Sequence, residues 1–115
     1  MSELLPTHRR PTTPGEMLVE EFLKPLKISQ TDFAKQIRVS QPRLNEIIKG
    51  KRAITPDTAL RLERVLGTSA GSWLNMQLIL DLYDAQHSGG AKEYVRLKPL
   101  IKAGRSGAAG VAIHA

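Results

Sequence analysis

The sequence predicts an all-α fold, with a five-helix domain followed by a C-terminal extension. Three observations predict it: helix start signals recur along the chain, apolar residues follow them at helical spacing, and Gly or Pro stands where helices should end. A length of 115 residues fits one domain with a single modest core. We expect an N-terminal arm over residues 1–12, the domain over residues 13–86 and a basic extension over residues 87–115.

The first predicted helix begins at a capping box. Thr13 stands at the N-cap, Pro14 at the first helical position, and Glu16 where its side chain can reach back to the Thr13 backbone. The apolar stripe behind this start consists of Leu18, Val19, Phe22, Leu23 and Leu26. We expect Pro25 to end the helix, because the residue before a proline is disfavoured in the α region.

Two short helices are predicted next, over residues 30–37 and 41–49. Ser29 and Ser40 are suitable N-cap residues for them, and Gly50 suits the position just past the second helix. The connection between the helices has only three residues, which forces the helices to cross steeply. That geometry is typical of a helix-turn-helix.

Two further helices complete the predicted domain. Thr55 opens the fourth, which ends at Gly67, and either Ser69 or Ser72 opens the fifth, which runs to about Gln86. The fifth helix is apolar on more than one face, so one face can pack on the domain while another needs a partner. We therefore expect dimerisation through this helix. The residues assigned to the dimer contact are Trp73, Leu78, Ile79, Leu82 and Tyr83.

The composition changes after the Ser88-Gly89-Gly90 segment. Residues 91–102 have the pattern of a short basic helix interrupted by Pro99, and residues 104–115 are mostly Gly and Ala. The latter composition predicts a loosely held tail.

Positive charge is concentrated in an internal block and in the tail. The formal net charge is +6, and residues 27–52 carry seven Lys or Arg against two Asp or Glu. A basic block on an otherwise near-neutral domain indicates a polyanionic partner, although a merely basic solvated surface is the alternative.

The second short helix has an outward face suited to reading DNA. Arg can bond bidentately to guanine, Gln and Asn can pair with adenine, and recognition helices contact bases mainly through their N-terminal residues. The residues expected at base edges are Gln41, Pro42, Arg43, Asn45 and Glu46. Phosphate contacts fix register but not sequence. The residues expected to make them are Gln30, Arg38, Ser40, Lys49, Lys51 and Arg52.

Other classes of function find little support in the sequence. The chain has no Cys, its three His residues have no metal-ligand spacing, and no nucleophile–base set, phosphate loop or dinucleotide motif is visible. We expect no catalysis, no metal and no cofactor. No apolar run approaches the roughly 20 residues of a membrane span, and no signal peptide is visible, so we expect a cytoplasmic protein without a membrane partner.

A combination of motifs extends over about residues 12–86. Its members are Pro14-Gly15-Glu16, Glu20-Glu21-Phe22-Leu23-Lys24-Pro25-Leu26, Leu44-Asn45-Glu46-Ile47, Gly50-Lys51-Arg52-Ala53-Ile54-Thr55, Asp57-Thr58-Ala59-Leu60-Arg61-Leu62 and Trp73-Leu74-Asn75-Met76-Gln77. The combination resembles the HigA-type antitoxins, the VapI-like branch of the XRE/Cro helix-turn-helix family.

The resemblance implies a fold, a function and partners. The implied fold is a lambda-repressor-like domain. The implied protein is a homodimer that binds a pseudo-palindromic operator in double-stranded DNA and represses its own operon. It would also neutralise a cognate ribosome-dependent mRNA-cleaving toxin of the HigB/RelE class. One position departs from the pattern, since Arg38 stands at the helix-ending position of the turn where the family usually has Gly.

Two alternatives remain open at the level of the sequence. The first is a stand-alone or phage-type transcriptional repressor without a toxin partner. The second is an interaction module that binds protein and not nucleic acid. A toxin-like reading frame next to the gene favours the antitoxin, and salt-dependent binding to DNA separates both repressors from the interaction module.

Overall fold

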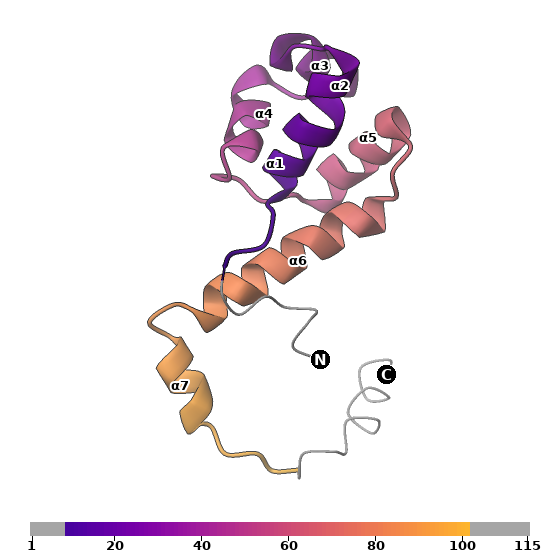
Figure 1. Ribbon diagram of the computed structural model, residues 1–115. Coiled ribbons are helices and arrows are strands. Elements are labelled where there is room, and N and C mark those ends of the chain that lie inside the picture. Colours follow the sequence, from indigo (N-terminus) through magenta and orange to yellow (C-terminus); the bar gives the residue numbers. More distant parts are fainter. Residues whose placement is uncertain (1–8, 102–115) are drawn as a thin grey trace. The chain divides into compact units, whose positions relative to one another are not determined.

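The computed structural model describes residues 9–101, and all the regular structure in this range is helical (Figure 1). The all-α prediction is thus confirmed. The chain divides after Asp84 into two compact units, of which the first contains nearly all of the helices predicted for the domain. No helix within residues 9–101 combines the length and the apolar character needed to cross a membrane.

The first helical segment begins at the predicted capping box. Helix α1 (Pro14–Leu18) starts where the Glu16 amide donates to Thr13 Oγ1 at 3.0 Å and the Thr13 amide donates to Glu16 Oε1 at 2.9 Å. The backbone then continues as a π-helical turn, η2 (Val19–Leu23), and as α2 (Lys24–Leu26).

The prediction that Pro25 ends this segment is wrong. The Lys24 amide donates to the Val19 carbonyl, five residues back, and the helix ends only at Lys27, whose φ is 54°. In a regular α-helix the ring of Pro25 would clash with the carbonyl of Glu21, four residues earlier. The wider π-helical turn moves that carbonyl away from the ring, so that the helix continues beyond Pro25.

The next two helices form the predicted helix-turn-helix. Helix α3 (Gln30–Ile37) is capped by Ser29 Oγ, and α4 (Gln41–Ile48) is capped by Ser40 Oγ, which accepts from the Arg43 amide at 3.2 Å. Both predicted caps are confirmed. The turn between them begins at Arg38 in the left-handed region, with φ 60° and ψ 46°.

Helices α5 (Pro56–Leu66) and α6 (Ala70–Gln86) are the fourth and fifth helices predicted for the domain. Thr55 caps α5, and Gly67 ends it with φ 81°, as predicted. Between the two serines considered for the next start, the structure selects Ser69, because its Oγ accepts from the Ser72 amide at 3.0 Å.

The core lies among α1 to α5 and the N-terminal half of α6. Its buried members are Leu18, Leu23, Phe33, Ala34, Ile37, Leu44, Ile47, Ile54, Ala59, Leu62 and Trp73. Each large apolar side chain that is fully removed from water contributes about 1.5–3 kcal/mol of transfer free energy. This shared core holds the two helices of the helix-turn-helix in a fixed relation.

Trp73 is a core residue, which corrects its assignment to the dimer contact. Its side chain is 2% exposed, its indole N–H donates to Thr68 Oγ1 at 2.6 Å, and its ring centroid lies 5.9 Å from that of Phe22. The apolar pattern of α6 did not reveal which face of the helix the domain covers. Trp73 lies on the covered face.

The second unit contains α7 (Ala91–Arg96), which realises the first half of the helix predicted over residues 91–102. Leu97 is already extended, with ψ 133°, so helical backbone ends before Pro99. Among the described residues of the second unit, the large exposed apolar side chains are those of Tyr94, Val95, Leu97, Leu100 and Ile101. The predicted Gly- and Ala-rich tail lies outside the described residues.

Candidate nucleic-acid interface

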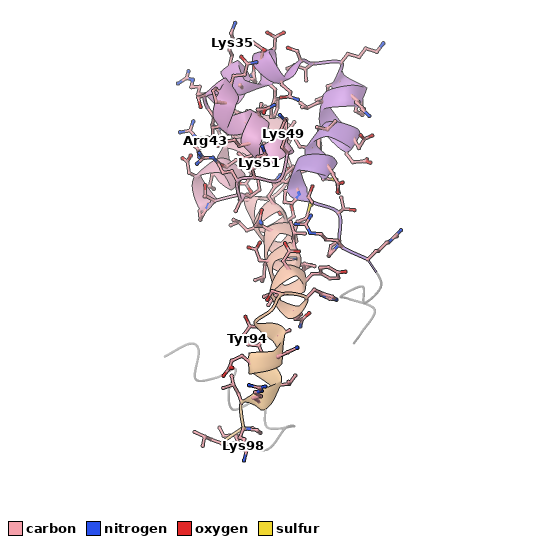
Figure 2. The ribbon with its side chains drawn as sticks, turned by 90° about the vertical axis from the view of Figure 1, so that its left-hand side faces the viewer. Lys35, Arg43, Lys49, Lys51, Tyr94 and Lys98 are labelled. Carbon is pink, nitrogen blue, oxygen red and sulfur yellow. The ribbon has the colours of Figure 1, made fainter. Side chains whose placement is uncertain are left out.

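Helix α4 presents its first turn to solvent on one side of the first unit. Gln41 and Pro42 are exposed, whereas Leu44 and Ile47 on the opposite face are 1% and 2% exposed. In Figure 2 this side of the unit faces the viewer, with Arg43 on α4 and Lys49 and Lys51 just beyond its end. The segment after Ser40 is therefore helical, and the described residues leave its first turn uncovered.

The C-terminal end of α4 is seated against the start of α1. A Cβ added to Gly15 would lie 2.5 Å from the Ile48 carbonyl oxygen and 2.6 Å from that of Ile47. Only a residue without a side chain permits this approach. The positive end of one helix thus meets the negative end of the other, a favourable dipole arrangement.

The turn before α4 is held by a side chain from α5. Arg61 Nη1 donates to the carbonyl oxygens of Ile37 at 3.0 Å and Arg38 at 3.2 Å. These carbonyls belong to the end of α3, where backbone acceptors lack helical partners. A charged donor at this point stabilises the left-handed turn and fixes where α4 begins.

The five residues predicted at base edges occupy two different environments. Gln41 and Pro42 are exposed, but Asn45 and Glu46 are half-buried and engaged within the chain. Asn45 Nδ2 donates to Gln30 Oε1 at 3.2 Å, which joins α4 to the start of α3. A predicted base reader and a predicted phosphate contact are therefore bonded to each other.

Glu46 is paired with Arg52, another residue predicted at the phosphates. The carboxylate accepts from Arg52 Nε at 2.9 Å and from Nη2 at 2.8 Å. The backbone amides of Lys51 and Arg52 also donate to the Glu46 carbonyl oxygen. The loop after α4 is consequently held against the helix through Glu46.

Arg43 does not point away from the body of the domain as predicted. Its side chain is 31% exposed and turns toward α5, where Nη2 donates to Asp57 Oδ2 at 3.2 Å and to Thr58 Oγ1 at 2.9 Å. The Nε atom is buried without a hydrogen-bond partner in the described part of the chain. Helical spacing alone places Arg43 on an outer face, but the proximity of α5 decides its direction.

The remaining residues predicted at phosphates form a basic rim around α4. Arg38 and Ser40 are exposed before the helix, and Lys49 and Lys51 are exposed after it. Ser40 uses its hydroxyl to cap α4. The arrangement offers cations at both ends of a helix whose first turn is open, which suits a duplex with a phosphate backbone on either side of a groove.

The start of α5 also belongs to this surface, although none of its residues was predicted there. Asp57 accepts from Arg61 Nε at 3.0 Å as well as from Arg43. The i, i+4 spacing of Asp57 and Arg61 on a helix was a signal for their pairing. The hydrogen bond from Arg61, followed by that from Arg43, holds the pKa of the Asp57 carboxyl below its ordinary value of 3.8.

The predicted dimer residues on α6 differ in exposure. Leu78 and Leu82 are 54% and 44% exposed, whereas Ile79 and Tyr83 are half-buried. Leu78 and Leu82 are four positions apart in sequence, so they lie on the same side of the helix, one turn apart. An apolar stripe therefore remains uncovered within the described residues of the first unit.

The comparisons with known proteins agree with this geometry. The sequence model of a helix-turn-helix family matches residues 19–73, from η2 to the first turn of α6. Virulence-associated protein I of Dichelobacter nodosus is 53% identical over 73 residues, which are 64% of this chain and 68% of that protein. Antitoxin HigA-1 of Vibrio cholerae is 36% identical over 81 residues, which are 70% of this chain and 76% of that antitoxin.

A solved structure extends the likeness to three dimensions. It is that of Pseudomonas aeruginosa antitoxin HigA with higBA promoter, which is 38% identical with a TM-score of 0.74. The match covers 80% of this chain and 100% of the Pseudomonas chain.

Proposed function

Because this chain belongs to the HigA family of helix-turn-helix antitoxins, we propose that it binds double-stranded operator DNA through α4 and represses transcription of its own operon. The observation that carries the proposal is the open first turn of α4, with Gln41 and Pro42 exposed and basic residues on both sides. The Pseudomonas antitoxin, whose structure includes a promoter, supports it.

The second part of the proposal is a homodimer formed through α6. The uncovered Leu78 and Leu82 supply an apolar contact, and a two-fold axis would bring two copies of α4 to one duplex. In such a dimer the two recognition helices stand about 34–36 Å apart and read a pseudo-palindrome. A footprint with two related half-sites is the expected result, and a footprint without two-fold symmetry would contradict it.

The third part concerns the toxin. We propose that the chain neutralises a HigB/RelE-type mRNA-cleaving toxin encoded beside it, and the antitoxins among its relatives support this. The competing function is that of a stand-alone or phage-type repressor. Co-expression with the product of the neighbouring gene separates the two, since the antitoxin co-purifies with its toxin and restores growth, whereas the stand-alone repressor does neither.

A shift assay with a duplex from its own promoter tests DNA binding directly. We expect log K to fall linearly with log salt concentration, with a slope of about −0.9 for each phosphate neutralised. If no promoter duplex is bound at low salt, the chain is an interaction module for proteins. In our proposal the chain acts in the cytoplasm by binding alone, without catalysis.

A further inference from the structure

The Arg43 guanidinium is hydrogen-bonded to residues of α5. Arginine has five N–H donors, two on each terminal nitrogen and one on Nε. Here Nη2 donates to Asp57 Oδ2 at 3.2 Å and to Thr58 Oγ1 at 2.9 Å. Nε is buried and unpartnered within the described residues. Nη2 thus uses both of its N–H donors on α5.

This occupation is incompatible with the bidentate contact of arginine to guanine. That contact needs two parallel donors aimed at O6 and N7. The two edges of a guanidinium that offer such a pair are Nη1 with Nη2, and Nε with Nη2. Both edges require Nη2, so Arg43 must leave Asp57 and Thr58 before it can read a guanine in this way.

The unpartnered Nε shows that the occupied position is not an optimal one for the side chain. A buried donor without an acceptor is destabilising, because it has given up water and gained no partner in the protein. The contact to Asp57 is partly exposed, and exposed ion pairs contribute little to stability because water screens them. The two effects oppose each other, so a guanine that offers two acceptors can compete for Arg43.

We propose that Asp57 and Thr58 form a latch for Arg43, which releases Arg43 to a guanine in the operator and takes it back when another base is present. The proposal rests on the proposed function, because it concerns the same DNA surface. Arg43 reads the base, and Asp57 is a positioning residue that acts through it. The latch lowers the affinity for the correct site and reduces the penalty of an incorrect base.

The latch is anchored to the helix-turn-helix itself. Asp57 is held by Arg61 Nε at 3.0 Å, and Arg61 also donates to the carbonyl oxygens of Ile37 and Arg38. Thr58 is 1% exposed and is fixed by its hydrogen bonds to Thr55. The acceptors therefore stay in place when Arg43 leaves.

The test compares Asp57→Asn with a control of equal charge, Asp32→Asn. Asp32 lies exposed in the first turn of α3, so its removal changes the charge near the DNA without touching Arg43. Affinities are measured for a duplex from the chain's own promoter and for duplexes in which each guanine is replaced singly by adenine or by 7-deazaguanine, which lacks the N7 acceptor. Arg43→Ala identifies the guanine that Arg43 reads.

We expect Asp57→Asn to bind the promoter more tightly than Asp32→Asn. We also expect the affinity ratio between the promoter and the duplex altered at the Arg43 position to widen by about two- to fivefold, the range of an exposed ion pair. In the Arg43→Ala background the added Asp57→Asn should leave this ratio unchanged. Thr58→Val, which removes the second acceptor, should widen it in the same direction.

Three results would overturn the latch. Equal gains on every duplex for Asp57→Asn and Asp32→Asn would show an effect of charge alone. A loss of affinity on all duplexes together with a lower melting temperature for Asp57→Asn would show that Arg43 only clamps α4 to α5. If the unmodified chain shifts no promoter duplex at low salt, the proposed function fails and the latch fails with it.

Discussion

Arg38 illustrates how one residue can trade stability for binding. Its φ of 60° places a side chain in the left-handed region, which costs about 1 kcal/mol relative to glycine. The side chain is exposed at the entrance to α4, where it can approach a phosphate.

We predict that Arg38→Gly raises the free energy of unfolding and weakens operator binding. The first effect removes the left-handed penalty, and the second removes a cation. Chemical denaturation and a shift assay measure the two quantities on the same preparation. Tighter binding by Arg38→Gly would refute the role in DNA contact.

The two kinds of DNA contact should separate in paired variants. We predict that Arg43→Ala loses about 1–3 kcal/mol of binding free energy on the operator and relaxes specificity at one base pair. Lys51→Ala should weaken binding to all duplexes alike and reduce the magnitude of the salt slope by about 0.9. Equal losses on every sequence for Arg43→Ala would show that this residue does not read a base.

The pairing of Arg43 with Asp57 should persist at neutral pH. A carboxyl whose pKa is lowered in the folded chain stabilises the fold above its ordinary value of 3.8 and loses that effect as the pH falls through the lowered pKa. We therefore predict that base discrimination at the Arg43 position is constant between about pH 6 and pH 8. Titration of the operator affinity over this range checks it, and a change there would implicate a different group.

Individual residues also differ in how far their roles could be predicted from the sequence. Caps at Thr13, Ser29 and Ser40 are local, because donor and acceptor are three residues apart, and all were predictable. Arg43 and Trp73 were misjudged. Their directions depend on neighbours supplied by the tertiary fold, such as Asp57 for Arg43, and helical periodicity does not contain that information.

At the scale of elements, the contact between α1 and α4 depends on Gly15. We predict that Gly15→Ala lowers the free energy of unfolding by about 1–3 kcal/mol. The added Cβ would clash with backbone carbonyls, which cannot move aside as a flexible side chain can. Operator affinity should fall as well, because the C-terminal end of α4 can no longer pack closely against α1.

Gly71→Ala is the matched control for this prediction. Gly71 lies in the first turn of α6 and has nothing within 4 Å of the added Cβ. Alanine in a helix is favoured over glycine by up to about 1 kcal/mol, so the control should melt at the same temperature or higher. Equal destabilisation by both changes would contradict the role assigned to Gly15.

The positions of most helices were predictable because their start and stop signals agree with their apolar spacing. The start of α5 after Thr55 and its end at Gly67 are examples. The π turn at Val19–Leu23 was not predictable in the same way. It is a compromise between the proline that follows and the packing of Leu18 and Leu23 in the core, and only the folded chain sets its outcome.

At the scale of the whole molecule, the uncovered stripe of α6 should control assembly. We predict that Leu78→Asp combined with Leu82→Asp converts the protein to a monomer in sedimentation experiments and weakens operator binding. Leu60→Asp, at a side chain 58% exposed on α5, is the control and should leave the assembly unchanged. A doubly substituted chain that still sediments as a dimer would contradict the α6 interface.

The buried indole of Trp73 has a practical consequence for all of these measurements. It is the only tryptophan in the sequence, and it lies in the core beside Phe22. Its fluorescence therefore reports the integrity of the domain, with emission that shifts to longer wavelength when water reaches the ring. Because the ring is shielded, adding DNA should not change its emission wavelength. Tryptophan fluorescence therefore follows unfolding independently of DNA binding.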